Sequence, residues 1–374
     1  HFAPVPGPEP HLAAGFHQRR ELAQGALVDA ALERHHVTGR VPEIHPAPAV
    51  ELGLLAGVQA HVLLAAAERI GERAVPGGGA VALALGYHLA TRKIPLVYLQ
   101  NSGLGNIINP LLSLADAEVY SIPLLLVIGW RGEPGVHDEP QHKKQGRVML
   151  SMLEAMEIPY SILGPEVEQA EGSLRDALGY VRKNNAPFAL VIKKGTFKTF
   201  AGSSGEKAAF ELTREAAIQQ VLGFLDERDV VVSTTGMASR EVYEHRSKQG
   251  DGHQRDFLTV GGMGHASQIA LGLALQKPDH SVYCLDGDGA VLMHMGALAI
   301  AGALKVPNFK HIVLNNGAHD SVGGQPTVGF TVDLLGIARA AAYERVWRAQ
   351  TQHELETCLI DLKHSKGPSL LEIR

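Results

Sequence analysis

The chain has little that would suit a secreted, membrane-bound or nucleic-acid-binding protein. Among 374 residues there are only two cysteines, Cys284 and Cys358, which indicates reduced buried thiols rather than a disulfide framework. No run of 18 apolar residues lacks charged or turn-forming residues, which argues against a spanning helix. The net charge is −5, which gives no polyanion-binding signature. We expect a cytoplasmic protein without a membrane or nucleic-acid partner.

The first 78 residues lack several residue types that occur in the rest of the chain. They contain no Lys, Ser, Asn, Tyr, Met, Cys or Trp, yet hold seven His and eight Pro, whereas residues 79–374 contain 16 Ser and 14 Lys. Low-complexity disorder would explain the bias, although Leu, Val and Ala are plentiful there. A second hypothesis is that a GC-rich gene is read in a shifted frame in this stretch. Sequencing of the coding DNA decides between them.

From Gly79 onward, apolar strand-like runs alternate with helix-like segments. Such alternation predicts an α/β protein with two Rossmann-like, doubly wound parallel-sheet domains. A Gly- and Ser-containing linker at 198–207 divides the chain into domains 1–200 and 208–374. The expected helices are 80–91, 106–115, 166–184, 213–225 and one ending near 156; the expected strands are 94–100, 122–129, 188–193, 229–233, 257–260, 281–285, 310–314 and 369–373.

One predicted βαβ unit carries polar groups at both of its strand ends. Gly287-Asp288-Gly289 closes the first strand, Asn315-Asn316 closes the second, and a helix is expected from Ala290 to about Lys305. A right-handed crossover brings both carboxyl ends to one edge of the sheet, where ligands bind. Asp288, Asn316 and a carbonyl such as that of Ala318 form a hard-oxygen set suited to Mg2+. The glycines let backbone N–H groups approach a phosphate.

The GDG…NN unit resembles the Mg2+-diphosphate motif of the thiamine diphosphate enzymes. Four further runs, at 100–106, 129–135, 138–142 and 315–327, are similar to the phosphonopyruvate decarboxylase family, and the likeness extends from about Gly79 to the C-terminus. The resemblance implies thiamine diphosphate and Mg2+ as cofactors and a pyrimidine-type domain followed by a diphosphate-type domain. It also implies a 2-oxo acid substrate and a homo-oligomer with active sites at subunit interfaces.

Three segments join a strand to a helix or loop and supply the candidate cofactor contacts. Met263 is placed like the bulky residue that props thiamine into a bent conformation in similar enzymes, although it could simply fill core. The Ser and Thr side chains could instead cap a helix. The candidates are Thr235, Gly236, Ser239, Gly262, Met263, His265, Gly287, Asp288, Gly289, Ala290, Asn316 and His319, with Asp288, Asn316 and Ala318 as metal ligands.

Candidate catalytic and substrate residues lie in both halves: Arg131, His142, His319 and Ser321. Arg131 could bind a phosphonate or carboxylate through two nitrogens, with Lys143 and Lys144 adding positive charge, although a loop arginine is often simply solvated. His142 and His319 could relay protons at neutral pH. Ser321 and Gln325 could bind the anionic end of the substrate or cap a turn.

One residue that the family pattern requires is missing. The resemblance implies a glutamate that contacts ring nitrogen N1′ of the cofactor, and Gly77 stands at its position; Glu72 is several residues too early. We therefore expect cofactor binding with slow deprotonation at C2. The leading hypothesis is decarboxylation of 3-phosphonopyruvate; the alternatives are sulfopyruvate decarboxylation or a non-catalytic, cofactor-binding chain. A Rossmann-type dehydrogenase is disfavoured because no strand precedes a G-x-G-x-x-G motif.

Overall fold

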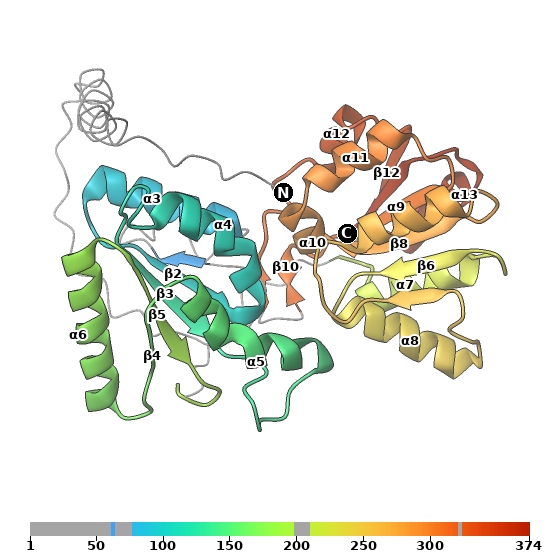
Figure 1. The fold of residues 1–374 in the computed structure, drawn as a ribbon. Helices are drawn as coiled ribbons and strands as arrows, with labels where there is room; N and C mark the ends of the chain where they lie inside the picture. Colours follow the sequence, from blue (N-terminus) through green and yellow to red (C-terminus); the bar gives the residue numbers. More distant parts are fainter. Residues whose placement is uncertain (1–60, 64–76, 198–209, 321–323) are drawn as a thin grey trace, which may run out of the picture. The chain divides into compact units, whose positions relative to one another are not determined.

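The computed structural model describes residues 61–63, 77–197, 210–320 and 324–374. All of them belong to one compact unit, Leu52–Arg374. They form two large sheets, of which one precedes residues 198–209 in the sequence and the other follows them, and one small two-stranded sheet (Figure 1). The α/β class and the two Rossmann-like parallel sheets that the sequence predicts are confirmed. The linker and most of the compositionally unusual stretch lie outside the described residues, so the predicted domain boundaries stay a prediction.

The first sheet has the strand order β1-β2-β3-β5-β4. Its strands are β1 (His61–Leu63), β2 (Leu96–Gln100), β3 (Leu124–Gly129), β4 (Tyr160–Ile162) and β5 (Pro187–Ile192). All pairs are parallel except β1 with β2. The helical segments are α3 (Gly77–Thr91), η1 (Asn101–Ile107), α4 (Ile108–Pro110), η2 (Leu111–Ala115), α5 (Pro140–Ala155) and α6 (Val167–Asn184).

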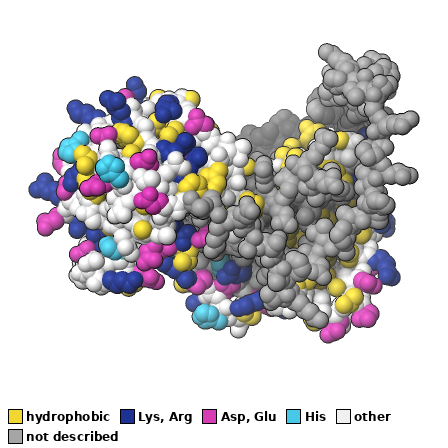
Figure 2. Space-filling view, turned by 180° about the vertical axis from the view of Figure 1, so that it is seen from behind, with side chains coloured by type: hydrophobic (Ala, Val, Ile, Leu, Met, Phe, Trp, Pro, Cys, Tyr) yellow, Lys and Arg dark blue, Asp and Glu magenta, His cyan; other side chains and the backbone are white. Residues whose placement is uncertain are grey.

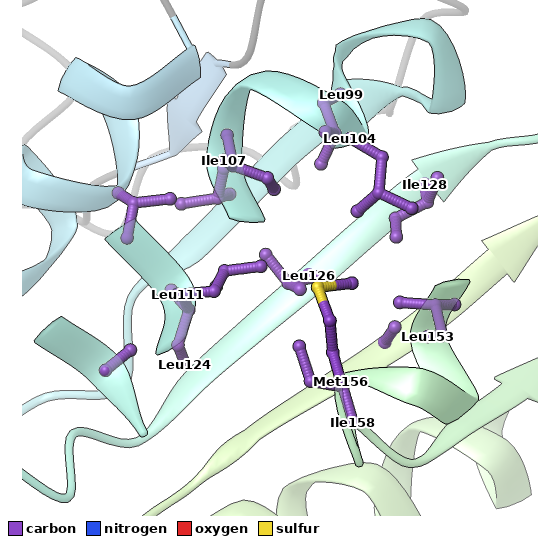
Figure 3. Packing of buried hydrophobic residues seen from close by; sticks show 14 of the residues in the cluster. Leu99, Leu104, Ile107, Leu111, Leu124, Leu126, Ile128, Leu153, Met156 and Ile158 are labelled. Carbon is purple, nitrogen blue, oxygen red and sulfur yellow. The ribbon is translucent and has the colours of Figure 1, made fainter. Parts of the chain in front are cut away.

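Both faces of the first sheet are covered, which explains why β3 and β5 are apolar along almost their whole length. Residues of α3, η1 and α5 pack on one face against alternate residues of β2 and β3, including Leu99, Leu126 and Ile128 (Figure 3). The other face, with Leu125 and Val127, packs against α6. This two-sided burial holds the carboxyl ends of β2 and β3 rigidly at one edge.

The second sheet is entirely parallel, with the order β12-β13-β9-β8-β6-β7. Its strands are β6 (Val230–Ser233), β7 (Asp256–Leu258), β8 (Val282–Gly287), β9 (Phe309–Leu314), β12 (Arg345–Ala349) and β13 (Ser369–Ile373). The hairpin strands β10 (Ala318–His319) and β11 (Gln325–Pro326) form a small separate pair.

Seven helices accompany the second sheet within the described residues: α7 (Arg214–Phe224), α8 (Met237–Gln249), α9 (Ala266–Gln276), α10 (Asp288–Met293), α11 (Gly296–Leu304), α12 (Leu334–Ala340) and α13 (Gln352–His364). One face packs against α7, α8 and α13. The other packs against α9, α10, α11 and α12. Strands β8 and β9 lie inside the sheet, so the ends that carry Asp288 and Asn316 are anchored by buried strands.

Several expected elements differ from the structure. The helix expected from Ala290 to Lys305 is two helices, because His294 leaves the helical conformation, with φ −129° and ψ 47°. The helix expected at 106–115 is a succession of 3-10, short α and π turns. Strands β4 and β12 and helices α12 and α13 were not predicted. The interruptions follow from tertiary packing, which local propensity does not report.

The contact between α11 and α12 gives a first prediction. A Cβ atom added at Gly302 would lie 1.5 Å from the carbonyl oxygen of Ala341, whereas nothing lies within 4 Å of one added at Gly272, in α9. Gly302→Ala should therefore lower the free energy of unfolding by about 3 kcal/mol or more. Gly272→Ala should leave it unchanged or raise it by up to about 1 kcal/mol, since alanine favours helix. Urea denaturation of both variants measures this; equal stabilities would contradict the packing described.

The charged surface is mixed. Figure 2 shows Lys and Arg side chains interspersed with Asp and Glu over the described part of the face that it presents, without a region of one sign. In the described part of the chain, no helix is long and apolar enough to cross a membrane.

Candidate functional site

The ends of β8 and β9 form the floor of a pocket. Gly287 and Leu314 are register partners in the parallel pair, so Asp288 and Asn316 follow their strands at the same edge. The pocket is lined by Arg214, Thr234, Thr235, Met237, Ala238, Met263, Asp286, Gly287, Asp288, Gly289, Ala290, Leu314, Asn316, Ala318, His319 and Asp320. Nine of the predicted cofactor and metal residues line it.

Asp288 is one of two buried acids that line this pocket, the other being Asp286. The carboxylate of Asp288 is 2% exposed and accepts a short hydrogen bond from the hydroxyl of Thr327. Burial raises the pKa of Asp288 to about 6, although Thr327 and the backbone N–H groups of Gly289 and Asn316 oppose this rise. The hydrogen bonds to Asp288 only partly offset the cost of burying its negative charge. A bound cation would offset that cost further, so the buried carboxylate is a strong ligand for a cation.

The two asparagines have different surroundings. Asn315 is fully engaged: its Nδ2 donates to Gly329 O at 2.9 Å and to Glu372 Oε1 at 2.7 Å, and its Oδ1 accepts from Gly317 N at 3.2 Å. Asn316 lines the pocket, and among the described residues its Oδ1 accepts from Ala318 N alone, at 3.1 Å. Asn315 therefore shapes the loop, while Asn316 can offer its oxygen to a metal ion.

Glu372 is a support that the sequence reading missed. It lies on β13 with an exposure of 0%. One oxygen accepts from Asn315 and from Arg374 Nε at 2.7 Å, and the other accepts from Arg348 Nε at 2.8 Å. The signal was a single acid in the otherwise uncharged strand at 369–373, since an acid in such a strand is rarely buried unless it is paired.

The segment after β6 is built to receive an anion. Thr234 Oγ1 is buried and has no hydrogen-bond partner among the described residues. Gly236 adopts φ +96°, immediately before the first turn of α8. Ser239 does not line the pocket; its hydroxyl donates to Thr234 O at 2.7 Å and so fixes this turn. Unpaired hydroxyl and N–H donors at a helix N-terminus suit phosphate oxygens.

Met263, His319 and Gly289 meet on another wall of the pocket. A Cβ atom at Gly289 would lie 2.3 Å from His319 Cε1 and 3.4 Å from Met263 Cε, so a larger residue would displace the His319 ring, whereas the contact with Met263 would be an ordinary one. Gly262 adopts φ +69° but does not line the pocket. Neither does His265, whose Nδ1 lies 3.0 Å from Gly262 O. The last two residues shape the loop that presents Met263.

The donor set fits a diphosphate carried by a divalent cation. It offers one carboxylate, one carboxamide oxygen and one backbone carbonyl, all hard ligands, beside the unpaired hydroxyl of Thr234. Arg214 was not predicted; it contacts Glu241 at 2.9 Å and Asp320 at 2.7 Å. No motif distinguished this arginine at the start of α7, so its place in the pocket depends on tertiary packing.

After the first sheet's strand β3, Arg131 and His142 share one carboxylate, that of Asp138. Arg131 donates through Nε at 2.8 Å and through Nη2 at 2.5 Å, and His142 Nδ1 lies 3.0 Å from Asp138 Oδ1. Gly132 N and Glu139 N also donate to this carboxylate, at 2.8 and 2.7 Å. The hydrogen bonds from Arg131 hold the pKa of Asp138 well below its usual range, in spite of burial. Because a carboxylate only accepts, it places the proton of a neutral His142 on Nδ1.

The loop that brings these three residues together is tightly packed. Gly132 adopts φ +68°, and a Cβ atom there would lie 2.1 Å from His142 O; one at Gly146 would lie 1.9 Å from Gly132 O. The side chain of Asn101 bonds both the N–H and the C=O of Arg131, at 3.0 and 2.8 Å. Arg131 is therefore held by Asp138 through Nε and Nη2, and within the described part of the chain its Nη1 donates to no partner and is available to another anion.

The remaining predicted positions differ in their surroundings. Lys143 and Lys144 are exposed on α5, whereas Gln325 is buried and pairs in register with His319. Ser321 lies outside the described residues. Gly77 is the buried first residue of α3, and a Cβ atom there would lie 2.9 Å from Ile107 Cγ2. Helix α3 therefore provides no carboxylate at position 77, and a larger residue there needs Ile107 to move.

Comparison with known proteins agrees with this geometry. Family models match at two places: the N-terminal TPP binding domain of thiamine pyrophosphate enzymes over residues 73–154 and the C-terminal TPP binding domain over residues 234–373. The first match begins slightly before Gly79, where the sequence resemblance was expected to start. Fold and site thus define a thiamine diphosphate enzyme.

Similarity to curated proteins shows to which group of thiamine diphosphate enzymes the chain belongs. The chain is 34% identical over 289 residues to phosphonopyruvate decarboxylase of Streptomyces viridochromogenes, covering 73% of this chain and 71% of that protein. It is 30% identical over 296 residues to sulfopyruvate decarboxylase of Methanosarcina acetivorans, covering 73% of each. The chain belongs to the family of thiamine diphosphate-dependent 2-oxo acid decarboxylases, which are carboxy-lyases, that includes phosphonopyruvate decarboxylase.

Proposed function

We propose that this decarboxylase converts 3-phosphonopyruvate to phosphonoacetaldehyde and CO2. The observation that carries the proposal is the pairing of Arg131 and His142 on the carboxylate of Asp138. A guanidinium whose Nε and Nη2 are fixed presents its last nitrogen in a defined direction, which suits a phosphonate with several acceptor oxygens. The similarity to phosphonopyruvate decarboxylase supports the same substrate.

Thiamine diphosphate, when bound, supplies the electron sink that decarboxylation of a 2-oxo acid requires. Asp288, Asn316 and the carbonyl of Ala318 would hold Mg2+, and Thr234, Thr235 and the turn at Gly236 would bind the diphosphate. Met263 would support the thiazolium ring. His142 and His319 would hold and return protons, His142 through the Nε2 atom left open by Asp138. We also propose a homo-oligomer, since the resemblance implies active sites shared between subunits.

Sulfopyruvate is the second candidate substrate. The specific observation in its favour is the 30% identity to a sulfopyruvate decarboxylase over most of both chains. A sulfonate also offers three oxygens to Arg131, but it carries one negative charge, whereas a phosphonate approaches two at neutral pH. The second charge would strengthen binding wherever another positive group faces the substrate.

A turnover assay with three substrates tests the proposal. The purified chain is supplied with thiamine diphosphate and Mg2+, and CO2 release is measured with 3-phosphonopyruvate, sulfopyruvate and pyruvate at equal concentrations. We expect the highest kcat/KM with phosphonopyruvate. A higher value with sulfopyruvate would transfer the proposal to that substrate, and equal values with pyruvate would show that no anion site discriminates among them.

The shared carboxylate gives a prediction of its own. Asp138→Asn keeps the shape of the side chain but replaces an acceptor oxygen by an amide donor, so both Arg131 and His142 lose their orientation. We expect kcat/KM to fall roughly 10- to 100-fold. Glu139→Gln is the matched control, because it removes the neighbouring charge without touching Arg131 or His142 through its side chain. Similar losses in the two variants would point to charge alone rather than to orientation.

A further inference from the structure

Beneath the cofactor pocket lies a second group of metal-ligating side chains, with a different chemistry. Cys284 and Asp286 stand two residues apart on β8 and so point to the same face of the sheet. His311 on β9 is the register partner of Cys284. One ligand atom from each residue lies within 4.8 Å of the other two, and His311 Nε2 is 3.4 Å from Asp286 Oδ2.

Burial makes this group unusual. Cys284 and His311 are 0% exposed and Asp286 is 1% exposed. His311 Nε2 is buried without a hydrogen-bond partner among the described residues. Its other nitrogen, Nδ1, lies 3.1 Å from the hydroxyl of Tyr343, so a proton on Nδ1 leaves the lone pair of Nε2 directed at Asp286. A buried nitrogen lone pair beside a carboxylate and a thiol is costly unless a cation joins them.

We propose that Cys284, Asp286 and His311 bind a thiophilic divalent cation of the Zn2+ type. A thiolate, a carboxylate and a neutral imidazole carry two negative charges together, which one divalent ion neutralises; a net charge of zero is what a fully buried site requires. The sulfur ligand selects Zn2+ or Co2+ over Mg2+. The site is thus chemically separate from the all-oxygen set at Asp288.

The surroundings supply the other parts of such a site. With a metal ion on Nε2, His311 Nδ1 would donate a hydrogen bond to the Tyr343 hydroxyl oxygen, 3.1 Å away, as metal-bound histidines do to their outer partners. Burial raises the pKa of the Cys284 thiol well above its usual value, so metal entry displaces a proton from sulfur as the metal–sulfur bond forms. Asp286 also lines the cofactor pocket, so a fourth ligand such as water would approach the ion from that side.

Cobalt titration tests the proposal without any need for catalytic turnover. The full chain is stripped with a chelator, reduced, and titrated anaerobically with Co2+ in the presence of excess Mg2+, which occupies oxygen sites. We expect a thiolate-to-cobalt charge-transfer band in the near ultraviolet that corresponds to one Co2+ per chain and is removed again by Zn2+. The seven histidines of residues 1–78 can also bind Co2+, but no cysteine occurs there, so they cannot produce this band.

The two cysteines of the chain provide a matched pair of variants. Cys284→Ser should abolish the charge-transfer band, whereas Cys358→Ser should keep it, since Cys358 packs in a different core cluster from Cys284 and its sulfur donates to the carbonyl of Arg348, at 3.8 Å. Tyr343→Phe should weaken Co2+ binding about 10- to 100-fold, which keeps the test informative if Cys284→Ser does not fold. Absence of the band in the wild type, or its loss only in Cys358→Ser, would overturn the proposal.

Discussion

Replacement of Asp288 by Asn is expected to lower the affinity for Mg2+, and through it for thiamine diphosphate, by at least about 100-fold. Asp288 is the one carboxylate in the proposed oxygen set, so the amide removes the only negative charge while keeping the size of the side chain. Isothermal titration of thiamine diphosphate at saturating Mg2+, and of Mg2+ at fixed cofactor, measures both affinities.

Without cofactor, the same substitution should not destabilise the protein at pH 7. Burial raises the pKa of Asp288 to about 6, above the value of about 3.9 in an unfolded chain. The carboxyl group therefore favours the folded state when protonated, and that contribution is lost as the pH rises through 6. At pH 7 the neutral amide avoids this cost, so Asp288→Asn should be at least as stable as the wild type, and the difference should shrink toward pH 4.

Asp320→Asn is the control for both measurements. Asp320 also lines the pocket, but its side chain is 54% exposed and pairs with Arg214. We expect cofactor affinity close to that of the wild type. If Asp320→Asn reduced binding as strongly as Asp288→Asn, general electrostatic attraction would explain the effect, and the assignment of Asp288 as a metal ligand would be wrong.

The alternation of strands and helices was predictable because parallel strands buried on both faces are apolar throughout, which local sequence reports. The break between α10 and α11 was not predictable from the sequence. The segment from Ala290 to Leu304 is apolar enough for one helix, but a Cβ atom at Gly264 would lie 2.4 Å from His294 Cδ2. The His294 ring thus occupies the space beside a glycine that is distant in sequence, and no local pattern reports such a contact.

The site was predictable to the extent that topology determines it. Asp288 and Asn316 follow adjacent strands, so the βαβ rule brings them to one pocket. The linkage of Arg131 to Asp138 depends on a loop conformation, with Gly132 at φ +68° packed on Gly146, and spacing alone does not specify that. The role of Asn315 differs from that of Asn316 because Asn315 donates a hydrogen bond to buried Glu372. These two residues are 57 positions apart in the sequence.

The second large effect concerns Gly77, where the family resemblance implies a glutamate. Gly77→Glu should accelerate exchange of the C2 proton of bound thiamine diphosphate by roughly 10²- to 10⁴-fold, the range of a positioned acid–base group. Exchange is measured by quenched-flow NMR in D2O with protein, cofactor and Mg2+ but without substrate. Decarboxylation of the preferred 2-oxo acid should rise in parallel.

The packing of α3 sets the design of this experiment. Any residue larger than glycine at position 77 places its Cβ atom 2.9 Å from Ile107 Cγ2, and Ile107 is fully buried in the first core (Figure 3). Gly77→Ala reproduces this contact without a carboxylate and should show only the stability cost, about 1–3 kcal/mol. Gly77→Gln adds the length of the side chain without its charge.

Comparison of the three variants separates the possible causes. If exchange accelerates in Gly77→Glu alone, the carboxylate activates the cofactor and the wild-type chain is limited by its glycine. If Gly77→Gln accelerates exchange equally, a hydrogen bond to the ring is sufficient and charge is not required. If Gly77→Glu binds the cofactor and remains folded but exchanges the proton at the wild-type rate, position 77 is not the place from which this protein activates thiamine diphosphate, and another acid must be sought.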